Sequence, residues 1–75
     1  MTTIAQLGNI KISVYADDHP PPHFHVTSPD ADAIVRIRDM VVMGCDGLHA
    51  DIKVAMKWAK HHREKILLTW IYMNG

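Results

Sequence analysis

Apolar and polar residues alternate along the first part of the chain, with the period of a β-strand that buries one side. Gly8-Asn9 interrupts this alternation between residues 3–7 and 10–15. The pair suits a two-residue turn, because glycine tolerates a positive φ at the first central position. A β-hairpin is therefore predicted, and its register pairs Leu7 with Ile10, Ala5 with Ile12, and Thr3 with Val14.

A second hairpin is predicted beyond a loop over residues 17–22. The three consecutive prolines of this loop lack backbone donors, which excludes them from the interior of a sheet. Strands are predicted over residues 23–27 and 33–38, and the pattern allows a short fifth strand over residues 40–43. The expected register places Val26 opposite Ala33 and Phe24 opposite Val35.

This register separates two faces, and a slip of one residue would bury the arginines. The predicted apolar face carries Phe24, Val26, Ala33, Val35 and Ile37. The predicted opposite face carries His23, His25, Ile34, Arg36 and Arg38.

From about His49 onward, the apolar residues follow a helical period. One straight helix of about 26 residues would be about 39 Å long, more than the roughly 30 Å diameter of a compact domain this size. A break is therefore predicted near Lys60 to Arg63. The predicted fold is a single α+β domain over residues 1–75, with a β-sheet half (1–45) and a helical half (46–75). Its antiparallel sheet has four or five short strands in two hairpins, and two C-terminal helices cover one face, leaving the other face open.

The composition narrows the functional classes. The formal net charge is zero, which argues against a strongly basic nucleic-acid binder and a polybasic membrane anchor. Cys45 is the single cysteine, so no internal disulfide forms. The longest apolar run, residues 40–43, is too short to span a bilayer, and the N-terminus does not resemble a signal peptide. A cytoplasmic protein without a membrane partner is expected.

Candidate chemistry is concentrated over residues 17–26. His23 and His25 are two apart on a predicted strand, so both side chains point to the same side. This geometry suits acid–base cleavage of RNA by a metal-independent endoribonuclease without a cofactor. The predicted catalytic residues are His23, His25 and Tyr15, and the predicted phosphate-binding residues are Lys11, Arg36 and Arg38.

Two other functions fit the same residues. A metal-binding module would hold zinc or nickel through His19, His23 and His25 with Asp17 or Asp18, although the spacing matches no strict zinc signature. A protein-interaction domain without catalysis would instead bind a partner through helices that carry Trp58 and Trp70. The plainest interpretation is an exposed set of histidines and a solvated face for the helical stripe of Lys53, Lys57 and Lys60.

One motif combines Asp18-His19, the prolines, and His23-Phe24-His25-Val26. Together with Trp58, His62-Arg63-Glu64 and Trp70, it resembles domain of unknown function family 4160, a bacterial family of small proteins. The resemblance implies a gene beside that of a small cognate protein, in pairs proposed to be toxin–antitoxin modules. The leading hypothesis is therefore the toxin of such a module, acting on or binding RNA. The small core also allows a weak homodimer.

Overall fold

The first hairpin forms where the alternation and the turn predicted it. In the computed structural model, which describes residues 2–16, 19–47 and 49–74, Leu7 pairs with Ile10 and Ala5 with Ile12. Gly8 has a φ of 66°, as the turn requires. The predicted pairing of Thr3 with Val14 is wrong, because the register shifts by one residue beyond Ala5 and Thr3 pairs with Ser13. Such a β-bulge takes up an extra residue that strict alternation does not foresee.

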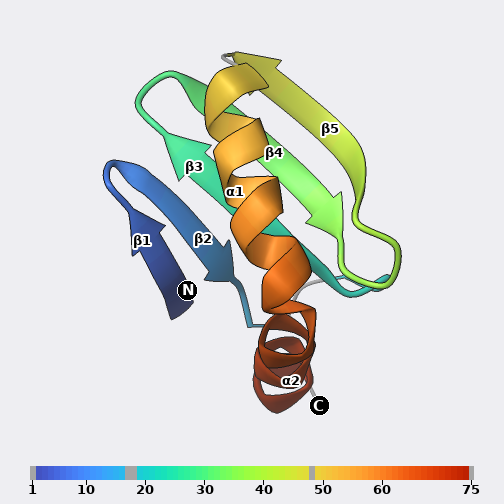
Figure 1. Ribbon diagram of the computed structural model, residues 1–75. Coiled ribbons are helices and arrows are strands. Elements are labelled where there is room, and N and C mark those ends of the chain that lie inside the picture. Colours follow the sequence, from blue (N-terminus) through green and yellow to red (C-terminus); the bar gives the residue numbers. More distant parts are fainter. Residues whose placement is uncertain (1, 17–18, 48, 75) are drawn as a thin grey trace.

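Five antiparallel strands form one sheet, and their spatial order follows the chain from β1 to β5 (Figure 1). Two helices follow the strands, which confirms the predicted α+β fold. The elements are β1 (Thr2–Leu7), β2 (Ile10–Val14), β3 (His23–Ser28), β4 (Ala31–Arg36), β5 (Val41–Gly47), α1 (His49–His61) and α2 (Arg63–Asn74).

The second hairpin, β3 with β4, has the predicted register. Val26 pairs with Ala33 and Phe24 pairs with Val35. All five residues of the predicted apolar face are buried, and α1 packs across this face over β2, β3 and β4. Ile52, Ala55 and Ala59 are the buried residues of α1. Burial of this apolar surface is the main source of stability in a domain of this size.

The last strand is longer than the predicted segment over residues 40–43, because β5 continues to Gly47. Cys45 and Asp46 therefore lie in the sheet, opposite Ala33 and Asp32. Gly47 has a φ of 93°, and a Cβ atom there would overlap the backbone of Asp30. Glycine at this position allows the β3–β4 turn to approach the end of β5.

The break between the helices is confirmed, since α1 ends at His61 and α2 begins at Arg63. The His62 amide donates to the Ala59 carbonyl at 3.0 Å, a tight turn of the kind found at helix ends. The Cα atoms span 32 × 22 × 20 Å, so a straight helix of about 39 Å would extend beyond the domain. Within the described residues, no helix is long and apolar enough to cross a bilayer.

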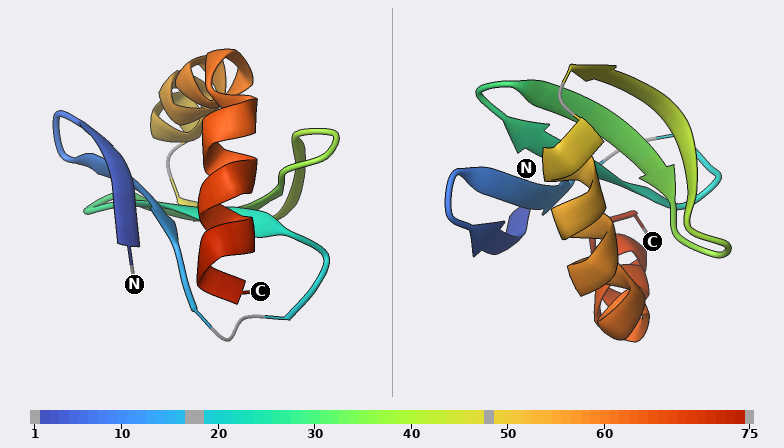
Figure 2. Two further views of the ribbon diagram at one scale, coloured as in Figure 1. Left: turned by 90° about the horizontal axis from the view of Figure 1, so that it is seen from below. Right: turned by 45° about the horizontal axis from the view of Figure 1, so that its top comes forward.

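The second helix does not remain on the side of α1. Figure 2 shows α2 passing the plane of the sheet, so its C-terminal half lies on the other side. Asn74 Nδ2 donates to the Tyr15 carbonyl at 3.0 Å, and Thr2 Oγ1 contacts Met73 Sδ at 3.4 Å. The expectation of a fully open opposite face is therefore wrong at Ser13 and His23, which are only 1% and 7% exposed.

Candidate functional site

The histidine face is the side of the sheet opposite α1. Alternation along the strands and the register of the sheet place its residues on one side. Its members are Lys11, Ser13, His23, His25, Asp32, Ile34 and Arg36 from the strands, with Tyr15 directly after β2.

Four aromatic side chains form a continuous row on the histidine face. The Tyr15 and His25 rings meet edge to face with centroids 4.4 Å apart. The His25 and His23 centroids are 5.2 Å apart, and His23 in turn lies 5.0 Å from the Trp70 ring of α2. These separations are typical of packed aromatic pairs. The row therefore brings together the three predicted catalytic residues, Tyr15, His23 and His25.

His23 is the buried imidazole of this row. Its Nδ1 atom lies 2.8 Å from the Pro21 carbonyl oxygen. Because a carbonyl oxygen only accepts hydrogen bonds, Nδ1 carries a proton, and in the neutral ring Nε2 is then the basic atom. Working histidines in metal and catalytic sites are commonly fixed in this way. His25 is only half-buried and is the more accessible of the two imidazoles.

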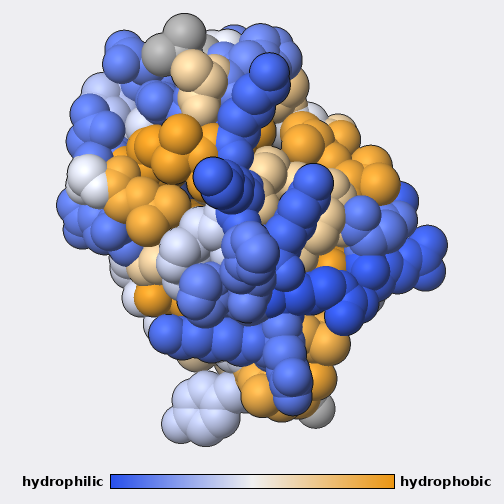
Figure 3. Space-filling view, viewed as in Figure 1, coloured by the Kyte–Doolittle hydropathy of each residue, from blue (hydrophilic) through white to orange (hydrophobic). Residues whose placement is uncertain are grey.

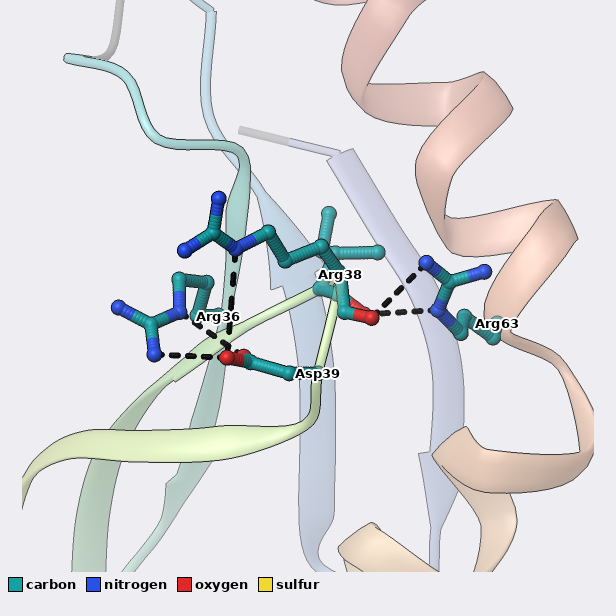
Figure 4. Close-up of polar contacts among 5 residues, drawn as sticks. Arg36, Arg38, Asp39 and Arg63 are labelled. Carbon is teal, nitrogen blue, oxygen red and sulfur yellow. Dashed lines mark hydrogen bonds and ion pairs between the residues drawn. The ribbon is translucent and has the colours of Figure 1, made fainter.

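Arg36 lies on the histidine face as predicted, directly opposite His23 in the sheet. Its Nε and Nη2 atoms donate to Oδ1 and Oδ2 of Asp39 at 2.8 and 2.7 Å, as Figure 4 shows. These hydrogen bonds raise the pKa of the Arg36 guanidinium and lower the pKa of the Asp39 carboxyl. The bidentate pair occupies donors that the RNA hypothesis assigned to phosphate.

Arg38 and Lys11 are the other two predicted phosphate-binding residues. The Arg38 side chain lies in the turn after β4 with 75% of its surface exposed, and its Nε atom is 4.0 Å from Asp39. Lys11 is exposed opposite Thr27, two positions along β3 from His25. The structure therefore brings Arg36 and Arg38 to the same carboxylate, Asp39, whereas Lys11 lies on a different strand, β2.

Arg63 holds this turn against the second helix. Its Nε and Nη2 atoms donate to the carbonyl oxygens of Ile37 and Arg38 at 3.0 and 2.9 Å (Figure 4). The start of α2 is thereby attached to the turn that carries Arg38 and Asp39. Both ends of α2 are tied to segments that flank the histidine row.

A shallow groove of about 370 Å³ lies beside His25, toward β5. It is lined by His25, Asp32, Ala33, Ile34, Gly44, Cys45 and Asp46. The lining combines an imidazole with two carboxylates and the exposed thiol of Cys45. This part of the histidine face is therefore not cationic.

The predicted metal ligands are only partly described. His19 is exposed, and Asp17 and Asp18 lie outside the described residues. Among the residues that the structure describes, no group of three or more His, Cys, Asp or Glu side chains is arranged to hold a metal ion. The metal-binding hypothesis stays a prediction.

Trp70 is the residue of this site that sequence reasoning missed. The sequence indicates a core or partner-facing residue, and in the structure Trp70 is 6% exposed and packs on His23. Its helical stripe predicted burial against the apolar face. No sequence signal indicated that the helix would pass the sheet and bring Trp70 to the histidines.

Comparison with known proteins identifies a family without assigning an activity. A family model described as "Domain of unknown function (DUF4160)" matches residues 9–71. No curated protein matches the chain, and no solved structure does. The match includes the whole histidine row, from Tyr15 to Trp70.

Proposed function

Because the chain belongs to the DUF4160 family, whose function is not defined, we propose a function from its own residues. The protein is the RNA-acting component, the toxin, of a bacterial two-gene toxin–antitoxin-like module. The histidine row is the observation that supports this function. It places an accessible imidazole between a phenol and a second imidazole whose orientation is fixed.

The two histidines have different roles in this proposal. His25 is half-buried and is the group that touches RNA, whereas the nearly buried His23 positions it. Contacts with Tyr15 and His23 restrict the His25 ring, and such pre-organisation favours reaction. Trp70 and the Pro21 carbonyl in turn hold His23.

The proposed reaction is transfer of a phosphoryl group within RNA. His25 takes the proton of a ribose 2′-hydroxyl, and the 2′-oxygen forms a bond to the adjacent phosphorus. The bond from phosphorus to the 5′-oxygen of the next nucleotide breaks. That oxygen receives the proton of the Tyr15 hydroxyl, and the products are a 2′,3′-cyclic phosphate and a 5′-hydroxyl. Proton transfer from His25 to Tyr15 through water restores both groups, so no metal ion is required.

The charges predict weak attachment to the RNA backbone. Arg36 is engaged with Asp39, which leaves Lys11 and Arg38 as the cations of the predicted set for phosphate. About two phosphate contacts to a single strand correspond to a slope near −1.4 of log affinity against log salt concentration. A short single-stranded substrate is therefore favoured over a long duplex.

The test measures cleavage of single-stranded RNA by purified protein in the presence of a chelator. His25→Ala is expected to lower the rate by about 10²- to 10⁴-fold while unfolding at the temperature of the wild type. His61→Ala, an exposed histidine on α1, is the matched control and should leave the rate unchanged. Full activity of His25→Ala would exclude this mechanism.

The same purified protein distinguishes the metal-binding alternative from the RNA proposal. The hydrogen bond between His23 Nδ1 and the Pro21 carbonyl fixes the imidazole in the way that metal-ligating histidines are commonly fixed, which is the observation in its favour. Elemental analysis of untagged protein, followed by zinc and nickel titration, tests it. Stoichiometric metal that is lost in His23→Ala would replace the RNA proposal with the metal-binding one.

A further inference from the structure

The outer face of α1 carries a row of cations. Lys53, Lys57, Lys60 and His61 are all exposed, at spacings that place them on one side of the helix. Asp51 is the one carboxylate of α1, and it accepts a hydrogen bond from Ser28 Oγ at 2.8 Å. Within the described part of the chain, none of the three lysines forms an ion pair. Their positive charge is therefore not compensated locally.

Apolar grooves flank this row on both sides. Figure 3 shows hydrophilic side chains over α1 with hydrophobic surface to either side. The groove toward the β1–β2 turn, about 550 Å³, is lined by Leu7, Val54, Lys57, Trp58, His61 and His62. The groove toward β5, about 440 Å³, includes Val42, Ile52 and Met56. Lys57 and His61 line both grooves.

We infer that this face of α1 docks an acidic amphipathic segment of a second protein. Apolar side chains of that segment fill the grooves, and its carboxylates lie against Lys53, Lys57 and Lys60. Apolar anchors surrounded by complementary charge are the usual form of a helix-in-groove interface. This surface lies on the opposite side of the sheet from His25. The inference is therefore independent of any action on RNA.

A second copy of the chain does not supply this chemistry. Its helices would bring more cations, since α1 has three lysines for one aspartate and α2 has Arg63 and Lys65 for one glutamate. Like charges placed together across an interface oppose association. The described chain therefore lacks a helical segment of the required charge, and the occupant is a different protein.

RNA fits this face less well than an acidic protein segment. Stacking of bases requires an open aromatic face. One side of the Trp58 ring is stacked on His62 at 4.0 Å, and the latter's Nδ1 donates to the Trp58 carbonyl. The apolar residues of the grooves other than Trp58 are aliphatic: Leu7, Val42, Ile52, Val54 and Met56. Phosphates would meet the lysines but would leave the apolar grooves empty.

The test uses the full chain and a synthetic amphipathic helix that has leucines along one stripe and glutamates elsewhere. Binding is followed by backbone amide chemical shifts and by fluorescence anisotropy of the labelled peptide. The expected shifts map to α1 and the edges of its two grooves. Lys57→Glu should weaken binding by about tenfold, whereas the matched change Lys65→Glu on α2 should alter it by less than about twofold.

A second pair of variants, at Val54 and Leu68, tests the apolar contribution to peptide binding. Val54 and Leu68 are 51% and 59% exposed, but only Val54 lines a groove beside α1. Val54→Ser should weaken peptide binding, and Leu68→Ser should not. Equal binding of a peptide with lysines in place of the glutamates would overturn the inference. Failure of the acidic peptide to bind would also overturn it. Binding of single-stranded RNA or phosphatidylserine vesicles at these lysines, in place of the peptide, would overturn it as well.

Discussion

The two faces of the sheet are covered in different ways. On the apolar face, α1 lies across three strands, and Phe24, Val26 and Val35 have no exposed surface. On the histidine face, only the C-terminal half of α2 reaches the strands, where Trp70 covers His23. His25, one pleat farther along β3, is already half-exposed. One face therefore supplies stability by apolar burial, while the other leaves polar side chains accessible beside a small covered patch.

The same contrast separates the two tryptophans. Trp70 is nearly buried against His23 and the core, whereas Trp58 is half-buried and stacks on His62 at the surface. Trp70→Ala should reduce the free energy of unfolding by about 3–5 kcal/mol, the larger of the two effects. Trp58→Ala should cost roughly 1–2 kcal/mol, because less apolar area returns to water. Urea denaturation followed by circular dichroism measures both.

A loss of this size can leave the Trp70→Ala variant unfolded, so Trp70→Phe provides a second measurement. Phenylalanine keeps a ring beside His23 and should retain the fold. Equal destabilisation by Trp70→Ala and Trp58→Ala would show that the histidine face is covered no more firmly than the outer surface of α1. The comparison between the two faces would then be wrong.

The second prediction concerns the attachment of α2 to the turn after β4. Arg63→Ala removes two hydrogen bonds, to the carbonyls of Ile37 and Arg38, and should cost about 1–2 kcal/mol. Arg63→Lys should retain only part of the stability that Arg63→Ala loses, because an ammonium cannot reproduce the planar pair of donors. Lys65→Ala, an exposed residue two positions later, should change stability by less than about 0.5 kcal/mol. An Arg63→Ala variant as stable as Lys65→Ala would contradict the proposed attachment.

Sequence patterns predicted the apolar face better than the histidine face, and the reason is physical. Strand alternation specifies which side is buried, so the sequence predicts the pairing of Phe24 with Val35. The helix break followed from length alone. Whether α2 crosses to the histidine face depends on the angle between α1 and α2, and no local sequence pattern encodes this angle. The contact of Trp70 with His23 was therefore not predictable.

Two other features of the structure were not predicted, because they too depend on three-dimensional geometry and not on a local pattern. Asp39 was not anticipated as the partner of Arg36, because a turn geometry brings residues three apart together. The extension of β5 to Gly47 was missed because glycines usually mark the end of a strand. Here Gly47 permits the approach of Asp30, a tertiary requirement. Candidate residues could be listed from the sequence, but their charge partners could not.

The third prediction concerns the carboxylate that engages Arg36. Its pKa is lowered in the fold by the hydrogen bond from Arg36, while its unfolded value is about 3.9. The associated stability is present above that unfolded value and is lost as the pH falls through the folded value. Asp39→Asn should therefore have a lower melting temperature than the wild type at neutral pH. In strong acid, the two proteins should melt at the same temperature.

The same variant sharpens the RNA proposal. Asp39→Asn releases Arg36 beside the histidine row, so single-stranded RNA should bind more tightly with one additional phosphate contact. The slope of log affinity against log salt should steepen by about 0.7. Asp46→Asn, a carboxylate on β5 away from Arg36, is the control for the change in net charge. An equal gain from both variants would mean that overall charge, and not Arg36, governs binding.

The smallest effect is expected at the free edge of the sheet. Every residue of β5 is exposed, and its one charged residue is Asp46, whereas natural edge strands commonly carry charges that prevent pairing with other chains. A weak homodimer through β5 is therefore predicted, detectable as a concentration-dependent sedimentation coefficient. Val41→Lys should abolish it while changing stability by less than about 0.5 kcal/mol. Thr3→Lys, on the opposite edge strand β1, should leave it intact. Sedimentation as a monomer by the wild type at all concentrations would show that the bulge in β5 is enough to protect this edge without charge.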